Sequence, residues 1–196
     1  MSEAAKVNDL QVHVGRFEVG FENISPELFK YRNFSGKNGD RYVQLELPEE
    51  YARELRNLGW RVKKRGLNEA IGGYMNSDNM DADLEDAHYF MSIKVNYEST
   101  VHVPDVWRIV DGYDAMVLLK PNHSNINRDI SVLDKDKILT ADLTISGSKP
   151  NSKDGLRTPY LWDAKFTVDR SYIDENNNKY AGFTRYADDG PLPWEQ

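Results

Sequence analysis

Apolar and polar residues alternate along many short stretches of this chain, and a period of two is the pattern of β-strands that bury one face. The run "RYVQLEL" (residues 41–47) has an apolar side chain at every second position, and "HYFMSIKVNY" (88–97) repeats the pattern. Leu10–Phe21 predicts a first strand in which Gly15 breaks the register. Further strands are expected at residues 28–34, 60–65, 105–110, 115–119, 141–146 and 159–168.

One segment, "LPEEYARELRNLGW", has the spacing of an amphipathic helix instead. Pro48 suits a first helical turn, and Glu49 beside it complements the positive end of the helix dipole. Gly59 suits the C-terminal end. A weaker helical turn is expected within Val132–Leu139.

The polar connections indicate a single domain and its boundaries. Ser35–Asp40, "SGKNGD", predicts an Asn-Gly hairpin turn. Residues 66–87, rich in Gly, Asn and Asp, are longer than an ordinary connection and predict a mobile inserted loop. Residues 171–196 are polar and then acidic, which predicts a disordered, flexible tail. The expected organisation is one folded domain over residues 1–170, with an N-terminal strand extension, followed by this tail.

Many short strands beside one good helix predict a mainly β fold with one or two short helices. A small closed or partly open β-barrel is the expected architecture. The OB-fold is a natural candidate among such barrels, because its strands and long loops bind oligonucleotides. A barrel of this size needs aromatic core residues, and we assign Trp60, Trp162 and Phe166 to that role.

Composition narrows the class of protein. The chain has no run of about 18 apolar residues and no secretory signal sequence at its start, so neither a membrane span nor secretion is expected. Because the sequence contains no cysteine, disulfides, thiolate metal sites and a cysteine nucleophile are excluded. A cytoplasmic protein is the simplest interpretation.

The formal net charge of −7 is unevenly distributed. Residues 78–86 hold five acids and the last ten residues hold three, with no cation in either segment. The rest of the chain has 24 acids against 25 Lys and Arg, and Phe29–Gly66 alone has ten cations against five acids. A basic surface beside acidic appendages is compatible with nucleic-acid binding.

Motifs of catalysis and metal binding are missing from the sequence. The four histidines lack metal-ligand spacing, and no HExxH, GxSxG or GxxxxGK[ST] motif occurs. The acidic run "DNMDADLED" lacks the Gly and the closing Glu of a calcium-binding loop, and "DENNNK" fails in the same way. We therefore expect no enzyme activity, no metal and no cofactor. An accessory enzyme of nucleotide or DNA metabolism would need a metal-dependent carboxylate cluster, which no pattern singles out.

Cations and aromatic residues are interleaved in the basic part of the chain. Single strands are held by cations that follow the phosphates and by aromatic faces that stack the bases, at roughly 1–3 kcal/mol each. Phe90 shares the polar face of its strand with Lys94, and an aromatic in that position needs an explanation. The expected nucleic-acid-binding residues are Lys30, Tyr31, Arg32, Phe34, Lys37, Arg41, Tyr42, Arg61, Lys63, Arg65, Phe90, Lys94, Trp107, Lys149, Lys153 and Arg157.

Two aromatic residues of the first hairpin remain alternatives to each other. Strand parity places Tyr31 and Phe34 on opposite faces, so only one of them can stack a base while the other joins the core. The residues of this hairpin most expected to contact a ligand are Arg32, Lys37, Arg41 and Tyr42.

The end of the tail carries a second signal. "DDGPLPW" joins acids to an apolar tip restrained by proline, which could dock on a partner protein or shield the chain's own binding groove. A solvated tail with a stray tryptophan is the alternative. The residues concerned are Asp188, Asp189, Leu192 and Trp194.

Three stretches together resemble the OB-fold single-stranded-DNA-binding proteins of bacteriophages and prophages. They are "YRNFSGKNGDRYVQLELPEEYARELRNLGWRVK", "YFMSIKVNY" and "DGLRTPYLWDAKFTV", and the likeness runs in order over roughly Phe29–Asp169. Tyr42 stands where many of those proteins carry Phe, which preserves stacking. Their tails end on an aromatic with its free carboxylate, whereas Glu195 and Gln196 follow Trp194 here.

The resemblance implies sequence-independent binding of single-stranded DNA, or alternatively RNA, in phage DNA replication, recombination or repair. It also implies a location in the cytoplasm of the infected bacterial host and replication or recombination proteins as partners of the tail. It is compatible with a homodimer. A different class of function stays open. The same β scaffold could be a protein-interaction or virion-assembly module that works through its acidic segments and binds no nucleic acid.

Overall fold

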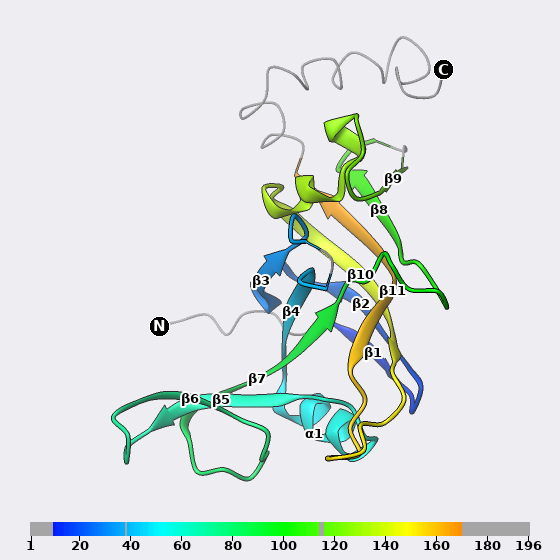
Figure 1. Cartoon of the computed structure of the whole chain (residues 1–196). Helices are drawn as coiled ribbons and strands as arrows, with labels where there is room; N and C mark the ends of the chain where they lie inside the picture. The colour runs from blue at the N-terminus through cyan, green and yellow to red at the C-terminus, as the bar shows by residue number, and fades with distance from the viewer. Residues whose placement is uncertain (1–9, 38, 114–115, 170–196) are drawn as a thin grey trace, which may run out of the picture.

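The computed structural model describes residues 10–37, 39–113 and 116–169, and these residues form a mainly β fold (Figure 1). The first half contains β1 (Gln11–Val14), β2 (Glu18–Ile24), η2 (Pro26–Leu28), β3 (Phe29–Asn33), β4 (Tyr42–Leu47), α1 (Glu49–Asn57), β5 (Lys63–Asn68), β6 (Gly73–Ser77) and β7 (Glu85–Lys94). The second half contains β8 (Asp105–Val110), β9 (Met116–Leu119), η3 (Ile126–Arg128), η4 (Ile130–Asp134), β10 (Ile138–Gly147) and β11 (Pro159–Val168).

The eleven strands of the described residues belong to one strongly curved sheet with the order β1-β2-β10-β11-β7-β4-β3 along its main path. β5 joins the edge of β7 and carries β6, while β8 joins β11 and carries β9. The mainly β class is confirmed. The closed barrel is not, because the path ends at β3 instead of returning to its first strands through hydrogen bonds.

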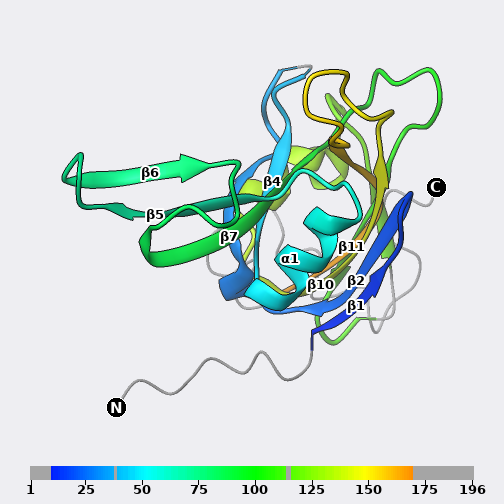
Figure 2. The ribbon, with the colours of Figure 1, turned by 90° about the horizontal axis from the view of Figure 1, so that it is seen from below.

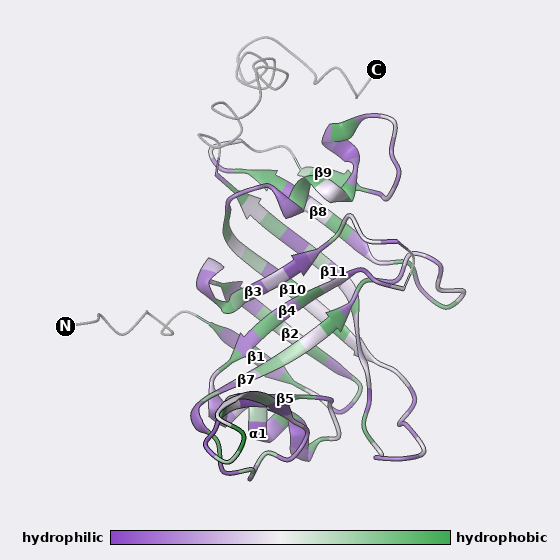
Figure 3. Ribbon diagram, turned by 60° about the vertical axis from the view of Figure 1, so that its left-hand side comes forward, coloured by the Kyte–Doolittle hydropathy of each residue, from purple (hydrophilic) through white to green (hydrophobic). Residues whose placement is uncertain are grey.

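The curved sheet wraps its apolar side around one core. Hydrophobic and hydrophilic residues alternate along the strands in Figure 3, as expected when one face is buried and the other meets water. Phe34 and Phe166 meet edge to face at 5.7 Å, and both are fully buried. Trp60 closes the end of the core near α1, where its Nε1 donates to the carbonyl of Gly15 at 2.8 Å. The assignments of Trp60 and Phe166 to the core are therefore confirmed.

The helix lies where the sequence predicted it. Pro48 precedes the first helical residue, and Gly59, with φ of +88°, follows the last turn. Only glycine adopts such a φ without strain, which explains why the helix stops there. Ala52 and Leu55 are the residues that α1 buries. Along the described part of the chain no helix is both long and apolar enough to cross a membrane.

Of three expected local structures, two are wrong and one is confirmed. Leu10–Phe21 is not one strand, because the chain reverses after Gly15 and β1 pairs antiparallel with β2. The expected hairpin turn at Ser35–Asp40 is confirmed: Asp40 N–H donates to the Lys37 carbonyl at 3.0 Å, Gly39 has φ of +85°, and Asn33 pairs with Tyr42 across the connection. Residues 66–87 are not a loop: β5 and β6 form a hairpin there, and β7 already begins at Glu85.

That hairpin projects from the body of the protein in Figures 1 and 2, and we call Lys63–Ser77 the arm. β5 is bonded to β7 along nearly its whole length, from Lys63 to Leu67, and to β6 on its other side, so the arm is the outer part of a three-stranded ribbon. The pairing with β7 supports the arm, because an isolated two-stranded hairpin is marginally stable in water.

A buried ion pair fixes the opposite end of the sheet. Arg108 on β8 is 1% exposed and bonds both carboxylate oxygens of Asp136, at 2.7 and 2.9 Å. Burial raises the pKa of Asp136 although Arg108 opposes that rise. The carbonyl of Asp136 also accepts from Arg32 at 3.3 Å, so the segment before β10 is tied to both β3 and β8.

Candidate nucleic-acid interface

The side of the sheet that faces away from the core carries aligned aromatic and basic residues on β3 to β7. Residues that pair across neighbouring strands point to the same side, so the register shows which side chains are neighbours. Asn33, Tyr42 and Lys94 form one row, and Tyr31, Gln44 and Ser92 form the next. We call this surface the outer face; its further members are Lys30, Glu46, Lys63, Arg65, Tyr74, His88 and Phe90.

The outer face is hollowed where the arm leaves the body. The hollow has a volume of about 410 Å³ and receives side chains from five strands, β3 to β7. Phe90 lies at its floor: it is 8% exposed and points away from the core, opposite Met91. The hollow is lined by Lys30, Tyr31, Gln44, Glu46, Arg65, Tyr74, His88 and Phe90.

A register shift in β3 aims two consecutive side chains outward. Phe29 pairs with Leu45 and Tyr31 pairs with Gln44, so one extra residue is inserted between the two pairs. Such a β-bulge locally breaks strict alternation. Lys30 and Tyr31 are consequently both exposed on the outer face, Tyr31 at 55%.

The alternative between Tyr31 and Phe34 is thereby settled. Phe34 is fully buried against Phe166, and Tyr31 is the exposed member of the pair. The backbone N–H of Phe34 donates to Asp134 at 2.8 Å, which holds the end of β3 against η4. Phe34 is therefore a core residue, and its assignment to the nucleic-acid surface is wrong.

Glu46 is the acidic residue that lines the first hollow, and it lies between Lys30 and His88. Lys30 Nζ lies 2.8 Å from one carboxylate oxygen, and His88 Nδ1 lies 2.7 Å from the other. Burial acts to raise the pKa of Glu46, but the hydrogen bonds from Lys30 and His88 outweigh it and hold this pKa below its ordinary value. Glu46 thus orients two donors at the floor of an otherwise basic and aromatic surface.

A second hollow continues the outer face toward the β3–β4 connection. Its volume is about 520 Å³, and it includes Tyr42, Ser92 and Lys94 as well as Gly39 and Asp40. Tyr42 is 37% exposed and pairs with Lys94, so an aromatic residue and a cation are cross-strand neighbours on the outer face. Lys37, in the connection itself, is also exposed.

The arm adds a further aromatic–cation pair. The Arg65 guanidinium lies over the ring of Tyr74, 5.9 Å from its centroid, and Tyr74 is 58% exposed. Both residues line the first hollow. They form one wall of it, while β3 and β4 provide the other.

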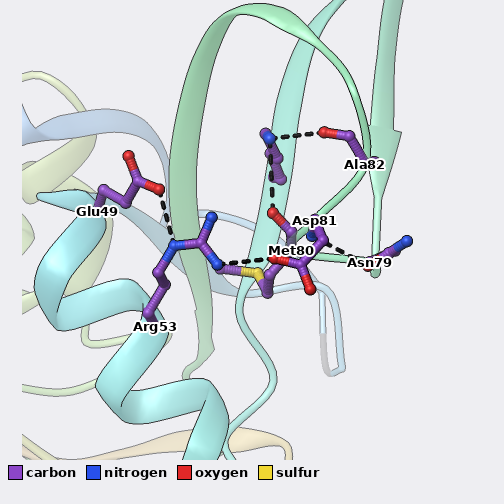
Figure 4. Close-up of polar contacts among 7 residues, drawn as sticks. Glu49, Arg53, Asn79, Met80, Asp81 and Ala82 are labelled. Carbon is purple, nitrogen blue, oxygen red and sulfur yellow. Dashed lines mark hydrogen bonds and ion pairs between the residues drawn. The ribbon is translucent and has the colours of Figure 1, made fainter.

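The root of the arm is bonded to residues 78–84, and these residues are bonded in turn to α1, as Figure 4 shows. Arg53 bridges Glu49 at 2.7 Å and Asp81 at 2.9 Å. Lys64 is 8% exposed and donates through Nζ to the carbonyl of Ala82 at 2.6 Å. The acidic run therefore acts as a strap that supports the arm.

Two of the predicted cations are committed to the fold. Arg41 is buried, at 6% exposure, and its Nε donates to the carbonyl of Phe34 at 3.0 Å. Arg32 points to the core side and donates to the carbonyl of Asp136. The residues next to Arg32 and Arg41 on their strands face outward. The sequence alone therefore did not separate these two cations from Lys30 and Lys94.

The remaining predicted residues lie away from the outer face. Arg61 pairs with Asp154 at 2.7 Å, and Arg157 lies over the Phe17 ring at 4.6 Å. Lys149 and Lys153 are exposed in the β10–β11 connection. Trp107 is half-buried on β8, in register with Lys165. The predicted residues that the outer face brings together are Lys30, Tyr31, Tyr42, Lys63, Arg65, Phe90 and Lys94, with Lys37 at its edge.

Sequence reasoning missed several members of this surface. Tyr74 fell in the presumed loop, although "GYMNS" alternates and is followed by a turn. His88 and Gln44 were visible as outward positions of their strands but were not chosen. Trp162 was assigned to the core and is 37% exposed.

Asp188, Asp189, Leu192 and Trp194, the expected partner-binding residues, lie outside the described residues. Within the described ranges, no group of three or more His, Asp or Glu side chains has the arrangement of a metal site. Comparisons with protein-family models, with curated proteins and with solved structures find no match for this chain.

Proposed function

We propose that this chain is a non-enzymatic single-stranded-DNA-binding protein and that its outer face holds the nucleic acid. The observation that carries the proposal is the placement of Tyr31, Tyr42 and Tyr74 on one continuous, hollowed surface. Single exposed aromatics are ordinary, whereas several gathered on one face mark an interaction surface. Here each of them stands beside a cation: Lys30, Lys94 and Arg65 respectively.

The chemistry of the face suits single strands of any sequence. Tyrosine rings stack on every base, at roughly 1–3 kcal/mol per base, and flexible cations accompany the phosphates without reading the sequence. The hollows are open grooves of several hundred Å³ in place of a closed base-specific pocket. Duplex DNA keeps its bases stacked on each other, so it should bind more weakly.

We further propose that the sheet is a variant of the OB-fold. β2 and β3 follow each other with only η2 between them, and together they resemble one bent strand that pairs with β10 at one end and with β4 at the other. With that strand counted once, the order is β2/β3, β4, β7, β11, β10, and β11 runs parallel to β7.

This interpretation agrees with the position of the outer face. In OB-folds, strands 2 and 3 and the loops after strands 1 and 4 bind oligonucleotides. The corresponding parts here are β4, β7 and the connection with Lys37, which carry the outer face, whereas the counterpart of the second loop, with Lys149 and Lys153, lies away from it. The role in phage replication, recombination or repair, in the host cytoplasm, rests on the sequence resemblance alone.

The direct test is a fluorescence-anisotropy titration with labelled oligo-dT and with a duplex of the same length. We expect oligo-dT to bind at low salt and the duplex to bind more weakly. Tyr42→Ala should weaken oligo-dT binding about 5- to 100-fold, because one stacking surface is lost. Tyr51→Ala on α1 is the matched control and should bind as the native chain does. Absence of oligo-dT binding at low salt would refute the proposal and favour the protein-interaction module.

The tail is proposed to recruit replication or recombination proteins or to compete for the outer face. Deletion of residues 188–196 removes Asp188, Asp189, Leu192 and Trp194. Oligo-dT binding by the shortened chain should be equal or tighter, because negative charge that opposes DNA is removed. A marked loss of affinity would contradict shielding.

A further inference from the structure

A stacked pair of rings lies on β11, beside the outer face. The rings of Trp162 and His102 are parallel to within 10°, with centroids 3.6 Å apart. Trp162 remains 37% exposed, and the neighbouring Val101 and Val103 are also exposed. Such a flat, partly open aromatic pair outside the core requires an explanation from its surroundings.

The pair forms where one edge of β11 changes its partner. Tyr160 is in register with Lys94 at the end of β7, and Asp163 is in register with Asp105 at the start of β8. Residues 95–104 leave the edge of β11 between these two points. Among the described residues, no strand lies next to the backbone of β11 there on that side.

His102 fills this gap. Its Nε2 donates to the carbonyl oxygen of Trp162 at 2.8 Å, so the imidazole replaces the missing strand as a hydrogen-bond partner. The same bond holds the imidazole flat against the indole. The stack is therefore fixed by the backbone and requires no rearrangement before a ligand binds, which lowers the entropic cost of binding.

A β-bulge directs the indole outward. The register of β11 with β10 shifts between Asp163 and Leu161, which leaves Trp162 as the extra residue. Leu161 and Ala164 are buried, and the two residues between them face away from the core. The bulge of β3 produces the same effect at Lys30 and Tyr31.

The Trp162–His102 pair continues the outer face. Tyr42, Lys94 and Tyr160 form a row across β4, β7 and β11, and Trp162 is two residues beyond Tyr160 on the same side. With strands about 4.8 Å apart and a rise of about 3.3 Å per residue, Trp162 lies roughly 12 Å from Tyr42. A single strand of a few nucleotides spans this distance.

We propose that Trp162, supported by His102, is a nucleobase-stacking site at one end of the path of the single strand. This inference rests on the proposed function and extends it to a surface that the sequence did not indicate. Asp105 and Asp163 follow directly on the same side. Because their charge repels phosphate, the nucleic-acid backbone turns away after the base that stacks on Trp162.

Two measurements test the proposal. In a variant with Trp107→Phe and Trp194→Phe, the only remaining indoles are Trp162 and the fully buried Trp60. Saturation with oligo-dT should quench the emission of Trp162 in this variant. Trp162→Ala should weaken oligo-dT binding roughly 5- to 100-fold, His102→Ala should weaken it less, and Trp162→Phe should restore most of the affinity.

The results separate this inference from the proposed function. Native affinity in Trp162→Ala together with unquenched indole emission would overturn the stacking site, while Tyr42-dependent binding would leave the proposed function standing. A chain that does not bind oligo-dT at all would refute the proposed function itself. Circular dichroism shows whether Trp162→Ala is folded. If it is not, quenching and the Trp162→Phe variant decide the question.

Discussion

The salt dependence of single-strand binding follows from the number of cations that the outer face offers to phosphates. For single strands, the slope of log K against log salt concentration is about −0.7 for each phosphate that is neutralised. Five described cations stand on or beside the outer face: Lys30, Lys37, Lys63, Arg65 and Lys94. If all five meet phosphates, the slope is about −3.5, and affinity falls roughly 100-fold between 50 and 200 mM salt.

Each cation that is removed should make the slope shallower by about 0.7. Lys94→Gln and Arg65→Gln test this at the two ends of the surface, and the double variant should lose about 1.4. Lys120→Gln is the matched control, because Lys120 is exposed next to β9, away from the outer face. The assay is a set of anisotropy titrations of labelled oligo-dT at four or more salt concentrations.

Two results would refute this reasoning. A slope near zero with measurable binding would mean that phosphates do not meet these cations. An unchanged slope in the Lys94→Gln and Arg65→Gln double variant, with a changed slope in Lys120→Gln, would place the nucleic acid on another surface of the protein.

Three further predictions concern the fold that carries this surface. Phe34→Ala should lower the free energy of unfolding in urea by about 3–5 kcal/mol, because it opens a cavity beside Phe166; Tyr31→Ala should leave stability almost unchanged and weaken binding. Asp136→Ala should cost about 3–5 kcal/mol in the same assay, because it leaves Arg108 buried without its carboxylate; a cost below 1 kcal/mol would contradict this. Because the folded pKa of Glu46 lies below its ordinary value of 4.5, its ionised form stabilises the folded state at neutral pH. That contribution is lost as pH falls through the folded pKa, so unfolding midpoints of the native chain and of Glu46→Gln should converge in acid; a constant difference would refute the assignment.

The strands and the helix were predictable because their signals are local. "RYVQLEL" and "HYFMSIKVNY" carry the period of two, and the helix has its proline at one end and Gly59 at the other. The arm was not predicted, because Gly, Asn and Asp are typical of loops and pairing between β5 and β6 overrides that preference. Propensity is a weak guide wherever partner strands determine the structure.

The candidate site was only partly predictable, for a different reason. Odd and even positions of a strand predict which face a side chain is on only while the alternation is unbroken. β-Bulges interrupt the alternation at Tyr31 and at Trp162. The sequence also does not show which outward cations are used by the fold. Arg41 bonds a carbonyl seven residues away, whereas Arg32 bonds one that is 104 residues away.

The central position of β11 has a consequence for how the protein is made. β11 is the last strand along the described chain, and it pairs with β10, β7 and β8. Most of these pairings join residues that are far apart in sequence, and such topologies fold slowly. During synthesis, the apolar sides of β4 and β7 stay uncovered until residues 159–168 leave the ribosome. Translation products that end before Pro159 should therefore aggregate. The chain can fold only after the last strand of the domain has been translated.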